Sequence, residues 1–187
     1  MQTAEHLRFS AEDYLAWEET QAEKHEFVAG EVFAMAGARQ DHVIVSLNIA
    51  SALKRRLRGT PCRAYIADMK LRVETADAFF YPDVMVSCNP EDRQAKQFLS
   101  HPTLIAEVLS ESTADYDRGG KFVAYRKLAS LQEYLIVDIE ARRVECFRRT
   151  DDGDWLLHDY IGEVDCQLTS LSLSLPLAEI FEDIEPT

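Results

Sequence analysis

Two acidic residues stand within runs of apolar residues, where an ionised side chain is costly. Asp83 begins an apolar segment after Tyr81-Pro82, and Glu107 lies in the middle of another, Leu104-Ile105-Ala106-Glu107-Val108-Leu109. A buried carboxylate must be paired, protonated or bound to a cation, because a lone buried charge is strongly unfavourable. Asp83 and Glu107 on successive strands therefore predict a cation between them, or a pair of acids satisfied by backbone donors and a lysine.

Metal-assisted hydrolysis is the chemistry that such a pair could perform. Mg²⁺ is typically held by one or two carboxylates, with waters and substrate phosphates completing its coordination. A bound Mg²⁺ or Mn²⁺ activates a water and stabilises the charge that develops on an attacked phosphate. A lysine nearby can position that water, and Lys121 is available for this role.

The spacing of apolar residues predicts the elements that position these side chains. Residues 41–57 carry apolar residues at steps of three and four before Gly59, which is typical of a long helix. Shorter helices are expected at residues 10–20, at residues 121–128 with Asp117 as N-cap, and after Pro176. Alternating patterns predict a hairpin at residues 25–35 and strands at residues 62–67, 69–73, 79–87, 104–109, 133–139, 144–149 and 155–160. This order indicates an α/β (α+β) fold, with a mixed β-sheet flanked by helices in one domain over residues 1–187.

Five ordered segments also carry a family resemblance. They are His25-Glu26-Phe27-Val28-Ala29-Gly30-Glu31, Ala67-Asp68-Met69-Lys70-Leu71, Tyr81-Pro82-Asp83-Val84, Glu107-Val108-Leu109-Ser110 with Ser112-Thr113, and residues 121–125 with Glu133-Tyr134. Together they resemble the PD-(D/E)XK nuclease superfamily, and within it the bacterial Uma-type restriction-endonuclease-like proteins. The resemblance implies a restriction-endonuclease-like fold, Mg²⁺-dependent endonuclease activity and a nucleic-acid substrate, DNA in the first instance.

One position departs from the superfamily pattern. That pattern has an acid and a lysine two residues apart on one strand, where period-two geometry puts both on one face. Leu109 stands at the lysine position here. In the Uma-type group a lysine from the following helix resembles a migrated replacement. The resemblance therefore implies Asp83 and Glu107 as catalytic metal ligands and Lys121 as the catalytic cation.

Glu31 and His42 are additional candidates for the same site. Many superfamily members contribute a further acid from an early element, and Glu31 follows the predicted hairpin turn. Alternatively, Glu31 only decorates the hairpin and His42 only occupies the first turn of the long helix. Asp68 and Lys70 match the group, but their alternation also fits the solvent face of a sheet, and we assign them no catalytic role.

The charge of the protein argues against an extended nucleic-acid-binding surface. The formal net charge is −13, whereas phosphate binding normally uses a basic surface. Any contact with nucleic acid must therefore be local. The segment Lys54-Arg55-Arg56-Leu57-Arg58 is one candidate, although cations there also complement the negative end of the predicted helix.

The remaining sequence features concern location, cysteines and assembly. Residues 1–9 lack the apolar core of a signal peptide and no apolar run spans a bilayer, so we expect a cytoplasmic protein with no membrane segment. Four cysteines without a CxxC pair, Cys62, Cys88, Cys146 and Cys166, predict free, partly buried thiols. Exposed sheet edges suggest a homodimer or higher homo-oligomer.

Two functional hypotheses remain in competition. The first is a metal-dependent endonuclease that hydrolyses phosphodiester bonds in DNA. The second is a catalytically inactive nuclease-fold protein that acts as a binding or oligomerisation module. The second is suggested by the net charge and by the displaced lysine.

Overall fold

The predicted apolar strands assemble into two sheets, with the two acids near the junction between them. The computed structural model describes residues 9–110 and 114–185. Residues 1–8, for which no signal peptide was expected, and Ser112-Thr113, which are part of the family resemblance, lie outside the described residues. The larger sheet has the order β11-β10-β9-β8-β6-β3, and only its β8 and β9 run parallel. Its strands are β3 (Arg63–Ile66), β6 (Val84–Ser87), β8 (Pro102–Val108), β9 (Glu133–Asp138), β10 (Arg143–Arg149) and β11 (Trp155–Ile161).

The second sheet has the order β2-β1-β5-β4-β7, and a separate ribbon pairs two further strands. The strands are β1 (His25–Val28), β2 (Glu31–Ala34), β4 (Lys70–Val73), β5 (Ala78–Phe80) and β7 (Phe98–Leu99), with β12 (Asp165–Leu168) and β13 (Leu173–Pro176) in the ribbon. The single strand predicted for residues 79–87 is wrong. Pro82 has no backbone N–H, and the chain leaves one sheet after β5 and enters the other at β6. Asp83 therefore lies where the chain passes between sheets.

The helices are α1 (Ala11–Glu18), α2 (Gln40–Arg56), α3 (Ala114–Tyr116), α4 (Phe122–Tyr125) and α5 (Leu177–Ile180). The 3-10 turns are η1 (Glu74–Ala76) and η3 (Thr169–Leu171), and a π-helical turn η2 (Asp117–Lys121) joins α3 to α4. The helix predicted to begin at residue 121 therefore extends back to Ala114, and Asp117 lies inside it instead of capping it. A π-helical turn is often found at functional sites.

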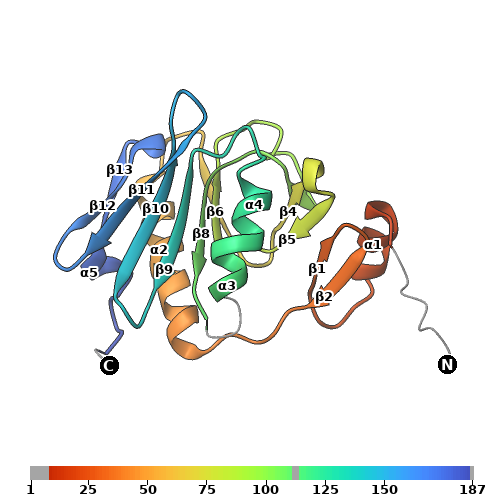
Figure 1. Cartoon of the computed structure of the whole chain (residues 1–187), viewed down its shortest axis with the longest axis horizontal. Helices are drawn as coiled ribbons and strands as arrows, with labels where there is room; N and C mark the ends of the chain where they lie inside the picture. The colour runs from red at the N-terminus through yellow and green to blue at the C-terminus, as the bar shows by residue number, and fades with distance from the viewer. Residues whose placement is uncertain (1–8, 111–113, 186–187) are drawn as a thin grey trace.

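Helices cover both faces of the larger sheet, as expected for a mixed α+β fold (Figure 1). Val45, Ile49 and Leu53 of α2 pack on one face against alternate residues of β6 and β8. On the opposite face, Tyr125 of α4 packs against residues such as Ile105. Because side chains alternate along a strand, Glu107 lies on the same face as Ile105 and points toward α4.

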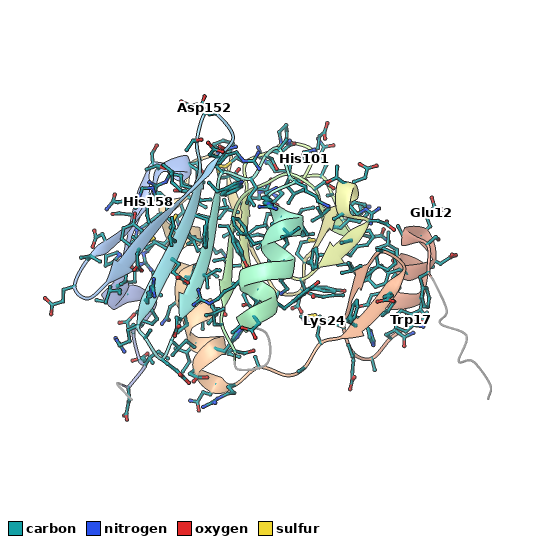
Figure 2. All side chains as sticks on the ribbon, viewed as in Figure 1. Glu12, Trp17, Lys24, His101, Asp152 and His158 are labelled. Atoms are coloured by element: carbon teal, nitrogen blue, oxygen red, sulfur yellow. A yellow bond between two sulfur atoms is a disulfide. The ribbon has the colours of Figure 1, made fainter. Side chains whose placement is uncertain are left out.

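The N-terminal helix packs on the hairpin of the second sheet. Tyr14 of α1 stacks on Phe27 of β1 and Phe79 of β5, with ring centroids 5.1 and 5.3 Å apart, respectively. Trp17 lies at this outer end of the molecule, where its ring contacts the ring of His25 at 4.7 Å (Figure 2). This cluster orients β1, the strand that carries Glu26.

The basic segment at the end of α2 is partly neutralised. Arg55 and Arg56 both form ion pairs with Glu179 of α5, and these contacts lower the pKa of Glu179, with Arg56 contributing most. The pairs tie α2 to the closing helix. Among the described residues, no helix is long and apolar enough to cross a membrane.

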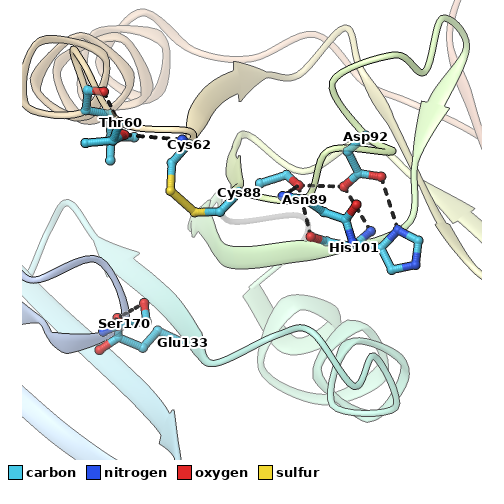
Figure 3. Close-up of a disulfide and its surroundings, with 10 residues drawn as sticks. Thr60, Cys62, Cys88, Asn89, Asp92, His101, Glu133 and Ser170 are labelled. Atoms are coloured by element: carbon cyan, nitrogen blue, oxygen red, sulfur yellow. Dashed lines mark hydrogen bonds and ion pairs between the residues drawn. A yellow bond between two sulfur atoms is a disulfide. The ribbon is translucent and has the colours of Figure 1, made fainter.

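The expectation of four free thiols is wrong for Cys62 and Cys88, which form a disulfide (Figure 3). Arg63 pairs with Ser87 across β3 and β6, so the preceding and following cysteines face each other across the two strands. Cys146 and Cys166 are free and buried, as predicted. The spacing of the cysteines in the sequence does not indicate this disulfide, because the strand register that brings Cys62 and Cys88 together depends on the tertiary fold.

We expect loss of this disulfide to lower stability by about 3 kcal/mol, since the bond closes a loop with a sequence separation of 26 residues. The measurement is urea denaturation of the native protein with and without dithiothreitol. A protein carrying Cys62→Ser and Cys88→Ser together should match the reduced protein and show no response to dithiothreitol. Equal midpoints for the oxidised and reduced native protein would contradict this prediction.

Candidate functional site

Asp83 and Glu107 face each other across two neighbouring antiparallel strands. Val84 of β6 pairs with Ala106 of β8, so the flanking Asp83 and Glu107 occupy the next opposed positions. The Asp83 backbone N–H donates to Glu107 Oε2 at 3.2 Å, and the Val108 N–H donates to Asp83 Oδ2 at 2.8 Å. The register of the sheet thus brings the two predicted acids together at one end of these two inner strands.

Lys121 joins these acids from the π-helical turn. Its Nζ lies 3.2 Å from Glu107 Oε1, 3.1 Å from Asp117 Oδ1 and 3.5 Å from Glu26 Oε1. Residues four apart in a helical segment share a face, which places Asp117 and Lys121 side by side. One ammonium group is therefore shared by three carboxylates from a helix and two different sheets.

Aromatic side chains seal the inner wall of this group. The Tyr125 hydroxyl donates to Glu107 Oε1 at 2.7 Å, and the Tyr134 hydroxyl donates to the Asp117 carbonyl at 2.9 Å. The Tyr125 and Tyr134 rings meet edge to face with centroids 5.5 Å apart. These rings exclude water from one side of the acids and hold Glu107, which is 2% exposed.

Burial makes the negative charge of the group expensive. It raises the pKa of Glu107 to about 8, although Lys121 acts in the opposite direction. Burial also raises the pKa of Glu26, again with partial compensation from Lys121. Strongly perturbed carboxyl pKa values in one cluster are typical of functional sites, and buried structural ion pairs can produce them as well.

Lys121 itself remains charged. Burial acts to lower its pKa, but the three neighbouring carboxylates outweigh burial and hold the pKa well above its usual range, with Glu107 the largest contributor among them. An ammonium fixed in this way acts as a permanent counter-charge and cannot serve as a base near neutral pH. Its chemical capability is to bind and stabilise anionic oxygen.

His42 also reaches the site, from the first turn of α2. Its Nε2 lies 3.2 Å from Asp83 Oδ2. Burial acts to lower the pKa of His42, but the hydrogen bond to Asp83 and the charge of that carboxylate raise it above its usual value. Together with the Val108 N–H, His42 fixes one oxygen of Asp83.

Glu31 is the one predicted candidate that the structure does not bring to this group. It is exposed and pairs with Val28 at the turn of the hairpin. Glu26, five residues earlier, contacts Lys121 instead, and its Oε1 accepts a hydrogen bond from the Tyr81 N–H at 3.3 Å. Sequence reasoning missed both Glu26 and Asp117.

The donor set is chemically suited to a hard divalent cation. Three carboxylates, those of Glu26, Glu107 and Asp117, contact Lys121, and Asp83 lies beside Glu107. Oxygen is the ligand that Mg²⁺ and Mn²⁺ prefer. The buried Oδ1 of Asp117 accepts no hydrogen bond of good geometry from a described residue, although it lies 3.1 Å from Lys121 Nζ. The Asp83 side chain is 18% exposed. Carboxyl groups therefore outnumber cations in this group, and one oxygen of Asp117 is unsatisfied.

The side chains are not preassembled as a complete metal cage. Within the described ranges, no three His, Cys, Asp or Glu side chains are already grouped closely enough to hold an ion. This arrangement is compatible with Mg²⁺, which usually takes only one or two protein carboxylates and keeps several waters. It is less compatible with zinc, whose sites are commonly built from three or four protein ligands.

Comparisons with known proteins show the family of the chain. Residues 11–181 match the Uma2 family, which is described as "Putative restriction endonuclease". Two uncharacterized proteins of Synechocystis sp. are similar: slr1290 is 37% identical over 95% of this chain and 93% of its own length, and sll1609 is 38% identical over 82% and 88%, respectively.

A solved structure has the same fold at low sequence identity. It is described as a "putative nuclease belonging to DUF820" from Anabaena variabilis. The TM-score is 0.77 with 15% identity, and the match covers 92% of this chain and 97% of the other. At this identity the likeness supports the restriction-endonuclease-like fold and leaves the roles of individual residues to the geometry above.

Proposed function

Because the chain belongs to the Uma2 family of restriction-endonuclease-like proteins, we propose that it is a metal-dependent endonuclease that hydrolyses phosphodiester bonds in DNA. The observation that carries this proposal is the meeting of Asp83, Glu107 and Lys121 in one small group, although they come from three separate segments. Family membership supports a nuclease-like function at the coarse level. The metal, the DNA substrate and the residue roles are our proposal.

Each side chain has a distinct part in the proposed reaction. Asp83 and Glu107 are the residues that would hold Mg²⁺ or Mn²⁺, with Glu26 and Asp117 adding negative charge around it. When bound, the ion would supply an activated water and charge stabilisation for the attacked phosphate. Lys121 positions the attacking water and stabilises the phosphate oxygens, while His42 holds Asp83 in orientation. Hydrolysis breaks the bond between phosphorus and the leaving oxygen, places the water oxygen on phosphorus and puts one of the water protons on the leaving oxygen.

One observation favours the alternative of an inactive nuclease-fold binding module. Lys121 already contacts three carboxylates, so it could serve as a structural substitute for a metal ion. In that case the cluster is a buried ion-pair network that binds no Mg²⁺. The surplus of carboxylates over cations argues against this reading, because a purely structural network is expected to be balanced.

The direct test is cleavage of supercoiled plasmid by the purified protein with MgCl₂, with MnCl₂ or with EDTA. We expect metal-dependent nicking or linearisation, and Asp83→Asn should reduce the rate roughly 100- to 1,000-fold, the range seen when one electrostatic contact to a transition state is removed. Asp152→Asn is a matched control, because Asp152 lies in the distant β10–β11 loop (Figure 2).

Three results would reject the proposal: no cleavage with any divalent metal, cleavage that persists in EDTA, or an Asp83→Asn protein as active as Asp152→Asn. Circular dichroism of each variant checks that the fold is retained. Parallel assays with single-stranded DNA and RNA of the same sequence would assign the substrate class.

A further inference from the structure

Two lysines gather around Tyr81 and take no part in the reaction proposed above. Lys24 Nζ lies 5.8 Å and Lys70 Nζ lies 5.6 Å from the centre of the Tyr81 ring. A cation within about 6 Å of an aromatic ring is attracted by its electron-rich face. We call Lys24 and Lys70 the lysine pair.

Strand order explains why these residues meet. Tyr81 follows β5, which lies between β1 and β4 in the second sheet. Leu71 of β4 pairs with Phe80, so the preceding Lys70 lies opposite Tyr81, and Lys24 immediately precedes β1 on the other side. Lys24 lies beside the N-terminal hairpin (Figure 2).

The lysine pair borders the candidate active site. The Tyr81 backbone N–H donates to Glu26 Oε1, which in turn lies 3.5 Å from Lys121. Asp83 follows Tyr81 by two residues. The Tyr81 hydroxyl donates to the buried Glu18 at 2.8 Å, so the ring is fixed and offers the lysines a rigid support.

The two lysines differ in how they are neutralised. Lys24 forms an ion pair with Asp68 and contacts the Ala67 carbonyl at 3.3 Å. For Lys70, no ion pair with any described carboxylate is formed. The lysine pair therefore carries one surplus positive charge at the edge of an acidic site, in a protein whose net charge is −13.

We propose that Lys70, assisted by Lys24, binds a backbone phosphate of the nucleic-acid strand next to the phosphate that is cleaved. This inference rests on the proposed nuclease function. An acidic protein needs a local cation to hold a polyanion beside carboxylates, and contacts to phosphates fix the register of the strand without reading its sequence. Asp68 competes with that phosphate for Lys24, so it weakens binding.

Removing the charge of Lys70 and removing the charge of Asp68 should change binding in opposite directions. A general structural role of these residues would not give opposite effects. The measurements use an Asp83→Asn background, which strongly slows cleavage. In this background Lys70→Ala should bind a short fluorescein-labelled duplex more weakly, and Asp68→Asn should bind it more tightly. Loss of one phosphate contact lowers the salt slope by about 0.9. Raising the salt fourfold should therefore weaken binding about threefold less for Lys70→Ala than for its parent.

Lys54→Ala is the matched control, because Lys54 belongs to the competing basic segment at the far end of α2. Fluorescence anisotropy over a salt series gives the slope for each protein. If Lys70→Ala keeps the parental slope, if Lys54→Ala loses as much as Lys70→Ala, or if Asp68→Asn fails to tighten binding, the lysine pair is not the phosphate site. If the binding changes are found but the native protein fails to cleave nucleic acid with any divalent metal, the phosphate site stands and the proposed nuclease activity fails.

Discussion

Replacement of Lys121 by methionine is expected to destabilise the protein by about 3–5 kcal/mol and to abolish metal-dependent cleavage. Methionine keeps most of the length and apolar volume of the lysine side chain but removes its charge. Glu107, Glu26 and Asp117 would then share a buried space without their counter-ion. Leaving buried charges unpaired costs far more than the ion pair contributes to stability when it is complete.

The loss should depend on pH, because protonation relieves the unpaired carboxylates. The expected difference from the native protein is therefore largest near pH 8 and smaller near pH 5. Thermal melts followed by circular dichroism provide the measurement, and a protein of this size should lose roughly 10 °C in Tm at the upper pH. Lys127→Met is the control, since Lys127 is exposed and follows the same helix. Similar melting curves for the two variants would contradict the central role of Lys121.

The effect of Mg²⁺ on the Tm of Lys121→Met distinguishes a metal-binding nuclease site from a purely structural ion-pair network. If the acids bind Mg²⁺, removal of the competing ammonium should strengthen binding, so MgCl₂ should raise the Tm of Lys121→Met more than that of the native protein. A network without a metal site should respond equally little in both proteins. Assays below the melting temperature of the variant then report on catalysis by a folded protein.

The central residues were predictable because their signals are local. Asp83 and Glu107 each interrupt an apolar run, and a carboxylate in that position requires a partner whatever the fold is. The strand register then places them opposite each other. Lys121 has no such signal in its own segment; its assignment came from family resemblance, and the structure places it beside Glu107.

Glu26 and Asp117 were missed for different physical reasons. Glu26 stands next to Phe27 and Val28 in a short strand, and such a strand does not reveal which of its faces is buried. Glu31 has the same residue type and seemed better placed after a turn. Asp117 was interpreted as an N-cap, although its spacing of four residues from Lys121 was a usable sign of a shared helical face.

Long-range pairing limited the prediction of the fold. The helix at residues 41–57 and most strands were predicted close to their observed positions, because periodicity is a property of each segment. The division of residues 79–87 between two sheets and the Cys62–Cys88 bond depend on which strands pair. Pro82 was a local sign that residues 79–87 divide between two sheets, whereas nothing near either cysteine indicated the disulfide.

Replacement of Glu107 by glutamine is expected to remove cleavage activity and yet stabilise the protein at alkaline pH. Burial raises the pKa of Glu107 from 4.5 to about 8 in the folded protein. The folded state therefore favours the protonated form, and the resulting stability is fully present below pH 4.5 and is lost as the pH rises through 8. Glutamine is neutral at every pH and avoids this loss, while Lys121 keeps Glu26 and Asp117 as partners.

The stabilisation should be about 2 kcal/mol near pH 8.5, because each unit of pKa shift is worth about 1.4 kcal/mol and the lost contacts to Lys121 and Asp83 offset part of it. At pH 5 the two proteins should have nearly equal stability. Urea denaturation at both pH values, with and without MgCl₂, gives the comparison, and added Mg²⁺ should stabilise only the native protein at pH 8.5. A difference between the two proteins that does not change with pH would contradict the raised pKa of Glu107.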